Sequence, residues 1–156
     1  MSKILRVNMS DLTVKFENVP DKYKLLGGRG LTSAIICDEV PPTCHPLGPN
    51  NKVALAAGIV TGTSAPTSGR ISIGGKSPLT GGIKEANSGG VAPQKLARLG
   101  IKAIIVEGQP KKRDKFWLLQ VNKDGAKLMP ADSYVGKGLY ETYPKLFAKF
   151  GKNVGI

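Results

Sequence analysis

The chain has 156 residues, of which 40% are hydrophobic and 22% charged, and its formal net charge is +12. This length and composition describe one globular domain with its own core and exclude a disordered chain. The longest apolar run, residues 53–60, is too short to span a membrane, and residues 1–11 lack the apolar segment of a signal peptide. We therefore expect a cytoplasmic protein that makes no membrane contact.

The basic charge favours an anionic partner, such as nucleic acid, a phosphate-bearing cofactor or an acidic protein. Lysines and arginines are spread along the chain, and only residues 111–113 form a tight cluster. Aromatic residues make up 6% of the chain, which offers no evident surface for stacking bases. Nucleic acid is therefore disfavoured as a partner, although a basic binding module stays open as an alternative function.

The cysteines and the single histidine give no catalytic or metal-binding pattern. Cys37 and Cys44 are separated by six residues, which matches neither a CxxC metal pair nor a disulfide framework. We expect both to be small buried or half-buried thiols in a reducing compartment. His45 lies in a Pro-rich loop without an identifiable partner base or nucleophile, so it is predicted to be a loop or packing residue. No catalytic residue is predicted.

Two short strands open the chain. Residues 4–8 and 12–19 are predicted to form an antiparallel hairpin around the turn at residues 9–11. In the second strand, Val14 and Phe16 alternate with polar residues, which is typical of a half-buried strand.

A helix and a buried strand follow. Leu31, Ala34 and Ile35 lie on a helical repeat within residues 31–40, and Pro41 ends this helix. The continuous apolar run at residues 52–60 predicts a buried strand.

The stretch from residue 58 to residue 90 is the most distinctive part of the sequence. It is rich in Gly, Ser, Thr and Pro, it contains the cation Arg70, and a short β-like run covers residues 70–73. Glycines allow a ligand to approach the backbone closely, and hydroxyl and amide side chains supply hydrogen bonds. We interpret this stretch as a surface that cradles a bulky ligand.

Two nucleotide-binding motifs are excluded. The Gly28–x–Gly30 pair resembles a damaged dinucleotide fingerprint, but the preceding elements are predicted to be antiparallel and no acidic residue follows at the required distance. Residues 75–77 resemble the end of a P-loop, but its first glycine would fall at Arg70, and Pro78 disfavours the helix that a P-loop must open.

Further elements are predicted in the last third of the chain: a helix at 91–100, a buried strand at 101–106, a hairpin of 115–121 and 126–129 around the turn 122–125, and a helix at 138–150. An anion is expected near the start of the first helix, next to residues 87–90.

The end of the chain is predicted from the pattern of residues 138–156. Leu139, Tyr143, Leu146 and Phe150 form the apolar face of the last helix, with Pro144 as a kink and Gly151 as its end. Residues 153–156 look like the opening of another strand. This abrupt end leads us to expect that the sequence is a piece of a longer or split protein.

Three motifs occur in order within the central stretch: TGTSAPTSGR at residues 61–70, KSPLTG at 76–81 and ANSGG at 86–90. In order and spacing they resemble the N-terminal domain of the aldehyde:ferredoxin oxidoreductases. The resemblance continues at residues 5–8, 28–31, 46–47 and 104–108, so it covers nearly the whole chain. It implies an α+β fold for residues 1–156, with antiparallel β-sheets and a few short helices.

The resemblance also implies a function. Enzymes of this family oxidise aldehydes to carboxylic acids and pass the electrons through a [4Fe-4S] cluster to ferredoxin. Their metal is tungsten, or molybdenum in some relatives, held by two pterin dithiolenes whose phosphates are bridged by magnesium. The N-terminal domain forms the base on which this cofactor lies.

Four residues match the family's cofactor-binding positions. By resemblance, Arg70 reaches between pterin and cluster, Asn87 contributes to the magnesium and the pterin phosphates, and Gly89 packs its backbone against the pterin. Ser88 lies between them in the same motif. The chemistry agrees, because a guanidinium offers planar donors, magnesium prefers hard oxygen ligands, and glycine permits close approach.

The sequence also departs from the family pattern. A second glycine-rich pterin motif and the cluster-binding cysteines are missing, and Cys37 and Cys44 match neither their spacing nor their location. We expect that this chain alone is not active and that later domains, in the same or a separate chain, complete the enzyme. A basic binding module and a non-functional fragment stay open as alternatives. The aldehyde, the choice between tungsten and molybdenum, and homodimer formation are also open.

Overall fold

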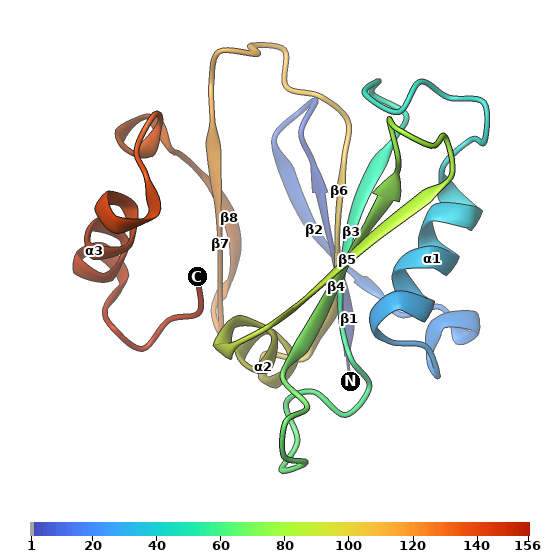
Figure 1. Ribbon diagram of the computed structural model, residues 1–156. Helices are drawn as coiled ribbons and strands as arrows, with labels where there is room; N and C mark the ends of the chain where they lie inside the picture. Colours follow the sequence, from blue (N-terminus) through green and yellow to red (C-terminus); the bar gives the residue numbers. More distant parts are fainter. Residues whose placement is uncertain (1) are drawn as a thin grey trace.

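A six-stranded mixed sheet organises the fold in the computed structural model, which describes residues 2–156 (Figure 1). The strand order is β2-β1-β6-β3-β4-β5, and every neighbouring pair is antiparallel except β1 and β6. The six strands are β1 (Lys3–Asn8), β2 (Thr13–Asn18), β3 (Lys52–Ala57), β4 (Arg70–Lys76), β5 (Ile83–Gly89) and β6 (Ile101–Glu107). The predicted α+β class with mainly antiparallel strands is confirmed.

The N-terminal hairpin is confirmed, but one of its residues is not buried as predicted. In its turn, the Asn8 side chain accepts a hydrogen bond from the Ser10 N–H at 2.8 Å, and Asp11 accepts one from the Thr13 N–H at 3.1 Å. Phe16 is 47% exposed. Val14, on the same face of β2, packs against an apolar cluster to which Phe16 does not belong, so the half-buried interpretation is wrong for Phe16 alone.

The parallel pair of β1 and β6 was not predicted from the sequence. Its register places Leu5 opposite Ile104 and Val7 opposite Val106. The two strands lie side by side in the middle of the sheet, and both faces carry buried residues: Ile4 and Ile105 on one face, Leu5 on the other. Parallel neighbours require a long crossover, which here includes helices α1 and α2 and the four strands β2 to β5.

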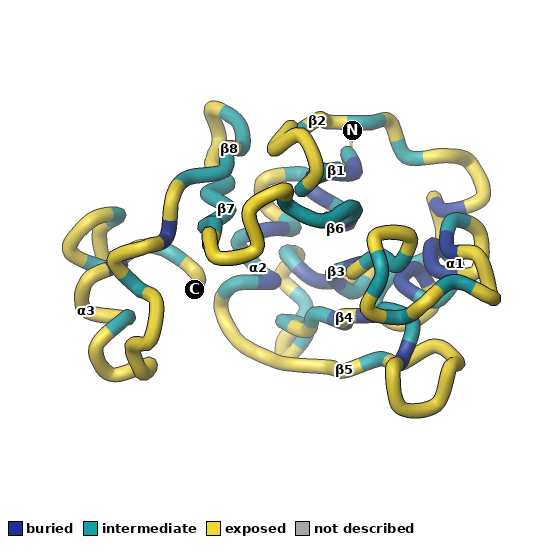
Figure 2. The backbone as a smooth tube through the Cα atoms, turned by 90° about the horizontal axis from the view of Figure 1, so that it is seen from above, coloured by how far each residue is buried: buried dark blue, intermediate teal, exposed yellow. Residues whose placement is uncertain are grey.

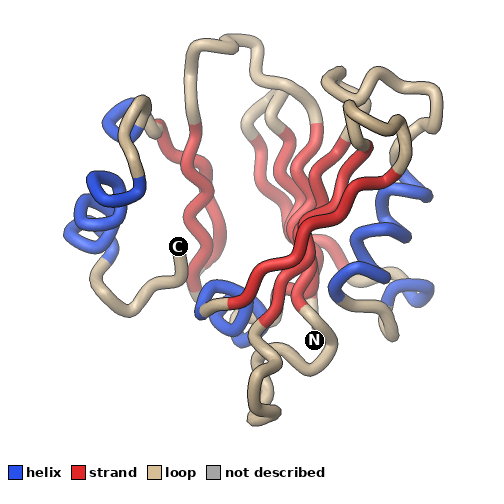
Figure 3. Tube along the Cα trace, viewed as in Figure 1, coloured by secondary structure: helices blue, strands red, loops and turns tan. Residues whose placement is uncertain are grey.

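Helix α1 (Gly28–Glu39) covers one face of the sheet (Figures 1 and 3). It begins three residues before the predicted helix and ends before Pro41, as expected. Leu31 and Ile35 are fully buried against this face, where Ala54 and Ala56 of β3 offer small side chains. The predicted strand at residues 52–60 is confirmed in part, because β3 ends at Ala57.

The other face is covered by helix α2 (Val91–Arg98) and by a separate two-stranded sheet of β7 (Trp117–Asn122) and β8 (Gly125–Pro130) (Figure 1). Both elements were predicted. The turn between β7 and β8 is closed by the Asn122 side chain, which accepts a hydrogen bond from the Asp124 N–H at 3.0 Å. Figure 2 shows that burial is concentrated between this layer and α1.

Helix α3 (Leu139–Phe150) lies at the outside of the molecule beyond the hairpin (Figures 1 and 2). Pro144 lies inside it and Gly151, with φ of 80°, follows its end, as predicted. The predicted apolar face is largely uncovered: Leu146 is 5% exposed, but Leu139 is 65% exposed. Among residues 2–156 there is no helix whose length and apolar character would let it cross a bilayer.

The predicted strand at residues 153–156 is wrong. These residues have no regular structure, and they lie against α2, where Lys95 Nζ donates a hydrogen bond to the Asn153 carbonyl oxygen at 2.9 Å. The prediction for the thiols holds for Cys44, which is half-buried, and fails for Cys37, which is exposed on α1. His45 lies in a loop, where its Nδ1 accepts a hydrogen bond from the Leu47 N–H at 3.2 Å.

Candidate cofactor-binding site

The central glycine-rich stretch folds as the edge of the sheet. Loop 58–69 leads into β4, loop 77–82 follows, and β5 returns alongside β4 as the outermost strand (Figure 1). Strand β5 was not predicted, because Ile83–Gly89 contains few strand-forming residues. Residues 87–89 therefore lie in a strand, and the predicted helix begins after them at Val91.

The register of β4 and β5 brings three of the four predicted site residues onto one face. Arg70 lies opposite Gly89, and Ser72 lies opposite Asn87. Because side chains alternate along a strand, these four residues share one face of the sheet. It is the face that α1 covers further along, since Gly74 packs directly against that helix. We call the four residues Arg70, Ser72, Asn87 and Gly89 the Arg70 strip.

Hydrogen bonds connect the polar members of the Arg70 strip. Arg70 Nε donates to Asn87 Oδ1 at 2.5 Å, and Asn87 Nδ2 donates to Ser72 Oγ at 3.0 Å. Arg70 and Asn87 are exposed, whereas Ser72 is 1% exposed. The strip thus connects a surface cation to a buried hydroxyl.

Ser88 lies apart from the other three predicted residues. It pairs with Ile71, whose side chain packs in the apolar cluster on the opposite face, and its Oγ donates to the Gly89 carbonyl oxygen at 3.2 Å. A ligand that contacts the Arg70 strip can reach Ser88 only through its backbone.

The outer end of Arg70 is available to a ligand. Among residues 2–156, its guanidinium makes one side-chain hydrogen bond, through Nε, and the two Nη groups have no acceptor. A Cβ placed on Gly89 would lie 3.6 Å from Nη1, so the glycine keeps the surface beside the guanidinium flat. Planar donors beside an open backbone surface suit a flat ligand with several hydrogen-bond acceptors.

Other glycines of the stretch serve internal packing. A Cβ on Gly74 would lie 2.9 Å from the Thr32 Cβ of α1, and a Cβ on Gly62, with φ of 90°, would lie 2.7 Å from the Ala97 Cβ of α2. These contacts are closer than a side chain tolerates. The abundance of glycine therefore reflects contacts within the protein as well as any ligand surface, which refines the interpretation from the sequence.

A carboxylate next to the strip was not found by sequence analysis. Glu85 shares the strip's face on β5, and its Oε2 accepts a hydrogen bond from Arg29 Nε of α1 at 3.1 Å. Its Oε1 is enclosed and has no hydrogen-bond partner among residues 2–156. The nearby Ser72 hydroxyl and, after it, the charge of Arg29 lower the pKa of Glu85. Its two-residue spacing from Asn87 would have indicated this position once β5 was recognised as a strand.

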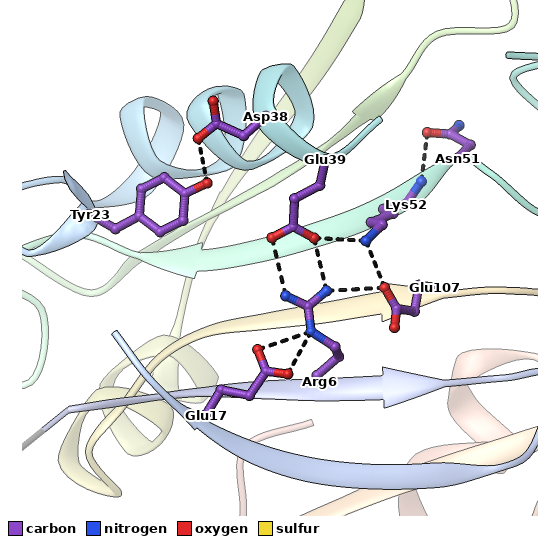
Figure 4. Close-up of polar contacts among 8 residues, drawn as sticks. All are labelled: Arg6, Glu17, Tyr23, Asp38, Glu39, Asn51, Lys52 and Glu107. Carbon is purple, nitrogen blue, oxygen red and sulfur yellow. Dashed lines mark hydrogen bonds and ion pairs between the residues drawn. The ribbon is translucent and has the colours of Figure 1, made fainter. Parts of the chain in front are cut away.

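A second charged group, the Arg6 cluster, lies on the same sheet face near the C-terminal end of α1 (Figure 4). Arg6 Nε pairs with Glu17 at 2.9 Å, and Nη1 pairs with Glu39 at 2.8 Å and with Glu107 at 3.0 Å. Lys52 Nζ bridges Glu39 and Glu107, at 2.7 Å from each. Five different elements supply these residues, so no sequence spacing indicated the cluster.

The pKa values in the Arg6 cluster follow from this pairing. Burial alone would raise the pKa of Glu39, but hydrogen bonds from Arg6 and Lys52 outweigh it and hold the pKa below its usual range. Burial would likewise raise the pKa of Glu107, but the hydrogen bonds and charges of Lys52 and then Arg6 outweigh it and lower this pKa. The hydrogen bond to Glu39 raises the pKa of Arg6 despite burial. These shifts keep Arg6, Glu39 and Glu107 charged at neutral pH.

The residues present fit a metal ion less well than they fit a pterin. The side-chain oxygen of Asn87, the predicted magnesium ligand, already accepts a hydrogen bond from a guanidinium, and a cation there would compete with Arg70. Residues 2–156 contain no group of three His, Cys, Asp or Glu side chains placed to hold a metal. A [4Fe-4S] cluster takes four cysteine ligands, and this sequence contains two cysteines.

Comparison with known proteins identifies the family. Residues 4–156 match the model of the aldehyde ferredoxin oxidoreductase N-terminal domain, and the chain belongs to this family. Tungsten-containing aldehyde ferredoxin oxidoreductases are similar over most of the chain: the enzyme of Pyrococcus horikoshii is 42% identical over 99% of it, and that of Pyrococcus furiosus is 41% identical over 90%. The predicted family is thereby confirmed.

Both relatives are longer proteins. The chain spans 25% of the P. horikoshii enzyme and 23% of the P. furiosus enzyme. A solved structure, the active site complex BamBC of benzoyl coenzyme A reductase in complex with 1,5-dienoyl-CoA, matches 97% of the chain with a TM-score of 0.88 and 27% identity, over 23% of its own chain. The same N-terminal fold thus occurs in proteins named for different substrates.

Proposed function

We propose that this chain is the cofactor-cradling N-terminal domain of an oxidoreductase that converts aldehydes to carboxylates. The observation that carries the proposal is the Arg70 strip, a cation with unused donors beside a glycine on an exposed sheet edge. This strip is formed by motifs that lie inside the family match.

In this proposal the cofactor is a tungsten or molybdenum bis-pterin, which supplies the redox chemistry when bound. The proposal of tungsten is based on the names of the relatives, which are tungsten-containing enzymes. The proposal of a pterin is based on the Arg70 strip, because a pterin is flat and rich in hydrogen-bond acceptors that suit the free donors of Arg70. Arg70 would bind it through its Nη groups, Gly89 would let it approach the backbone, and Asn87 would hold Arg70 in place. Ser88 would contribute through its backbone alone.

Magnesium and the iron-sulfur cluster have weaker support in this chain. Magnesium ligation by Asn87 stays a prediction, and the cation would compete with the Arg70 guanidinium for Asn87 Oδ1. The [4Fe-4S] cluster and the docking of ferredoxin would depend on residues outside this sequence, because two cysteines cannot complete a cluster.

The aldehyde substrate is proposed from the relatives that are about 40% identical to the chain. The match to a benzoyl coenzyme A reductase complex indicates that this fold by itself does not select the substrate. Substrate selection would then lie with the remaining part of the protein.

The proposal is tested by expressing the complete coding sequence that contains these residues in cells supplied with tungstate. Arg70→Ala and Arg70→Lys are compared with wild type by the tungsten and pterin content of the purified protein and by aldehyde-dependent dye reduction. We expect both variants to lose cofactor, with Lys retaining more than Ala, because lysine keeps the charge but not the planar donors.

Arg113→Ala is the matched control, since it removes one exposed positive charge from a loop distant in sequence from the Arg70 strip. It should keep full cofactor content and activity. Unchanged tungsten and pterin in both Arg70 variants would contradict the role proposed for this surface.

A further inference from the structure

Ser72 is a buried hydroxyl under the exposed edge of the sheet. It lies in the middle of β4, is 1% exposed, and accepts a hydrogen bond from Asn87 Nδ2 at 3.0 Å. The first residue of α1 lies above it: a Cβ on Gly28 would come within 3.5 Å of Ser72 Oγ. Since both α1 and β5 enclose this oxygen, Ser72 cannot contact a ligand on the surface.

The direction of each hydrogen bond in the strip is fixed by chemistry. A guanidinium can only donate, so Asn87 must turn its carbonyl oxygen toward Arg70 and its NH₂ group toward Ser72. Ser72 must then accept, which leaves its own proton free to donate. The Glu85 carboxylate lies on the same face of β5, and the nearby Ser72 hydroxyl lowers its pKa. The two hydrogen bonds thus run in one direction, from Arg70 through Asn87 to Ser72.

Helix α1 lies over the buried end of this series, because its first residue, Gly28, lies next to Ser72 Oγ. Arg29 donates to Glu85 from the first turn of the helix. The rotamer of Arg70, at the exposed end, depends on an amide that would lose its buried hydrogen-bond partner without Ser72. Asparagine side chains have two nearly isosteric orientations, and only one of them presents an acceptor to Arg70.

We propose that Ser72 is a positioning residue, whose buried hydroxyl fixes the Asn87 amide and thereby orients the Arg70 guanidinium toward the cofactor surface. That Arg70 is oriented toward a cofactor rests on the proposed function. The orientation of Arg70 by Ser72 and Asn87 does not depend on a cofactor. It assigns a role to a residue that no ligand touches.

The positioning is tested without cofactor by NMR of the ¹⁵N-labelled 156-residue chain, through the hydrogen exchange of the Arg70 Nε–H. In Ser72→Ala we expect this exchange to accelerate about five- to tenfold, as the loss of one hydrogen bond predicts. Asn87→Ala should accelerate it similarly. The double variant should add little, because the two residues act in series.

Ser77→Ala is the matched control. Ser77 is also buried, directly after β4, but within residues 2–156 its Oγ accepts hydrogen bonds only from the backbone N–H groups of Leu79 and Thr80. The Ser77→Ala variant should destabilise the loop after β4 and leave the Arg70 Nε–H exchange unchanged. Ser72→Cys keeps the side-chain shape but replaces Oγ by Sγ, which is a weak hydrogen-bond acceptor. It should therefore also accelerate the Arg70 Nε–H exchange, and it replaces the alanine variant if that variant does not fold.

The outcomes separate this inference from the proposed function. Unchanged Arg70 exchange in Ser72→Ala or Ser72→Cys, or an equal acceleration in Ser77→Ala, would overturn the positioning role and leave the cofactor proposal standing. Accelerated exchange confined to the Ser72 and Asn87 variants supports the positioning role. In that case a full-length Arg70→Ala protein with normal tungsten content would overturn the cofactor proposal alone.

Discussion

Two arginines on the same face of the sheet have opposite surroundings. Arg6 uses all three of its guanidinium nitrogens on the carboxylates of Glu17, Glu39 and Glu107, and its side chain is mostly buried. Within the part of the chain that the structure describes, Arg70 uses Nε alone, on a neutral amide, and is exposed. A saturated, enclosed cation holds elements of the fold together, whereas an unsaturated cation on an open surface is available to a ligand.

The largest expected effect is loss of stability in Arg6→Met. Removing the guanidinium leaves two partly buried carboxylates with Lys52 as their remaining partner, and breaking a buried pair in this way costs about 3 kcal/mol. Arg70→Met should change stability by less than about 0.5 kcal/mol, as exposed substitutions generally do. Urea unfolding of the two variants measures both values, and equal losses would erase the distinction between the two arginines.

The next effect concerns the glycines of the same face. Gly74→Ala inserts a Cβ within 2.9 Å of the Thr32 Cβ, and such overpacking costs about 1–3 kcal/mol. Gly89→Ala meets its nearest atom, Arg70 Nη1, at 3.6 Å and should unfold at nearly the wild-type urea concentration. If Gly89→Ala proved as destabilising as Gly74→Ala, the surface beside Arg70 would be packed rather than open.

A smaller effect is expected from acid. The pKa values of Glu39 and Glu107 are lower in the folded state than in the unfolded chain, so their contribution to stability is complete above the unfolded pKa of about 4.3 and is lost as pH falls through the folded values. The urea midpoint of the wild type should therefore fall below roughly pH 4. Arg6→Met should show a shallower decline there, and Arg70→Met should parallel the wild type.

Much of the fold could be predicted because its signals are local. The apolar runs of β3 and β6, the hairpin turns after Asn8 and Asn122, and the helix before Pro41 each depend on neighbouring residues. The parallel pairing of β1 with β6 joins residues about a hundred positions apart, and no local pattern records it.

The residues of the candidate site could be predicted from the sequence, but their arrangement in space could not. Motif resemblance indicated Arg70, Asn87 and Gly89, yet their common face depends on strand β5, whose polar sequence resembles a loop. Ser72 and Glu85 become visible only in the register of that strand. For α3 the helix itself was predicted correctly, but the burial of its apolar face was not. A helical period shows which residues share a face, and it does not show whether another surface covers that face.

The most direct test of the account asks whether the cofactor lies on the Arg70 strip. Full-length protein, purified with cofactor and from cells deprived of tungstate and molybdate, is treated with phenylglyoxal, and arginine modification is quantified by peptide mass spectrometry. We predict that cofactor strongly protects Arg70, whose free Nη groups are the reactive atoms, while Arg113 reacts equally in both preparations and Arg6 in neither. Equal modification of Arg70 with and without cofactor would contradict the central claim.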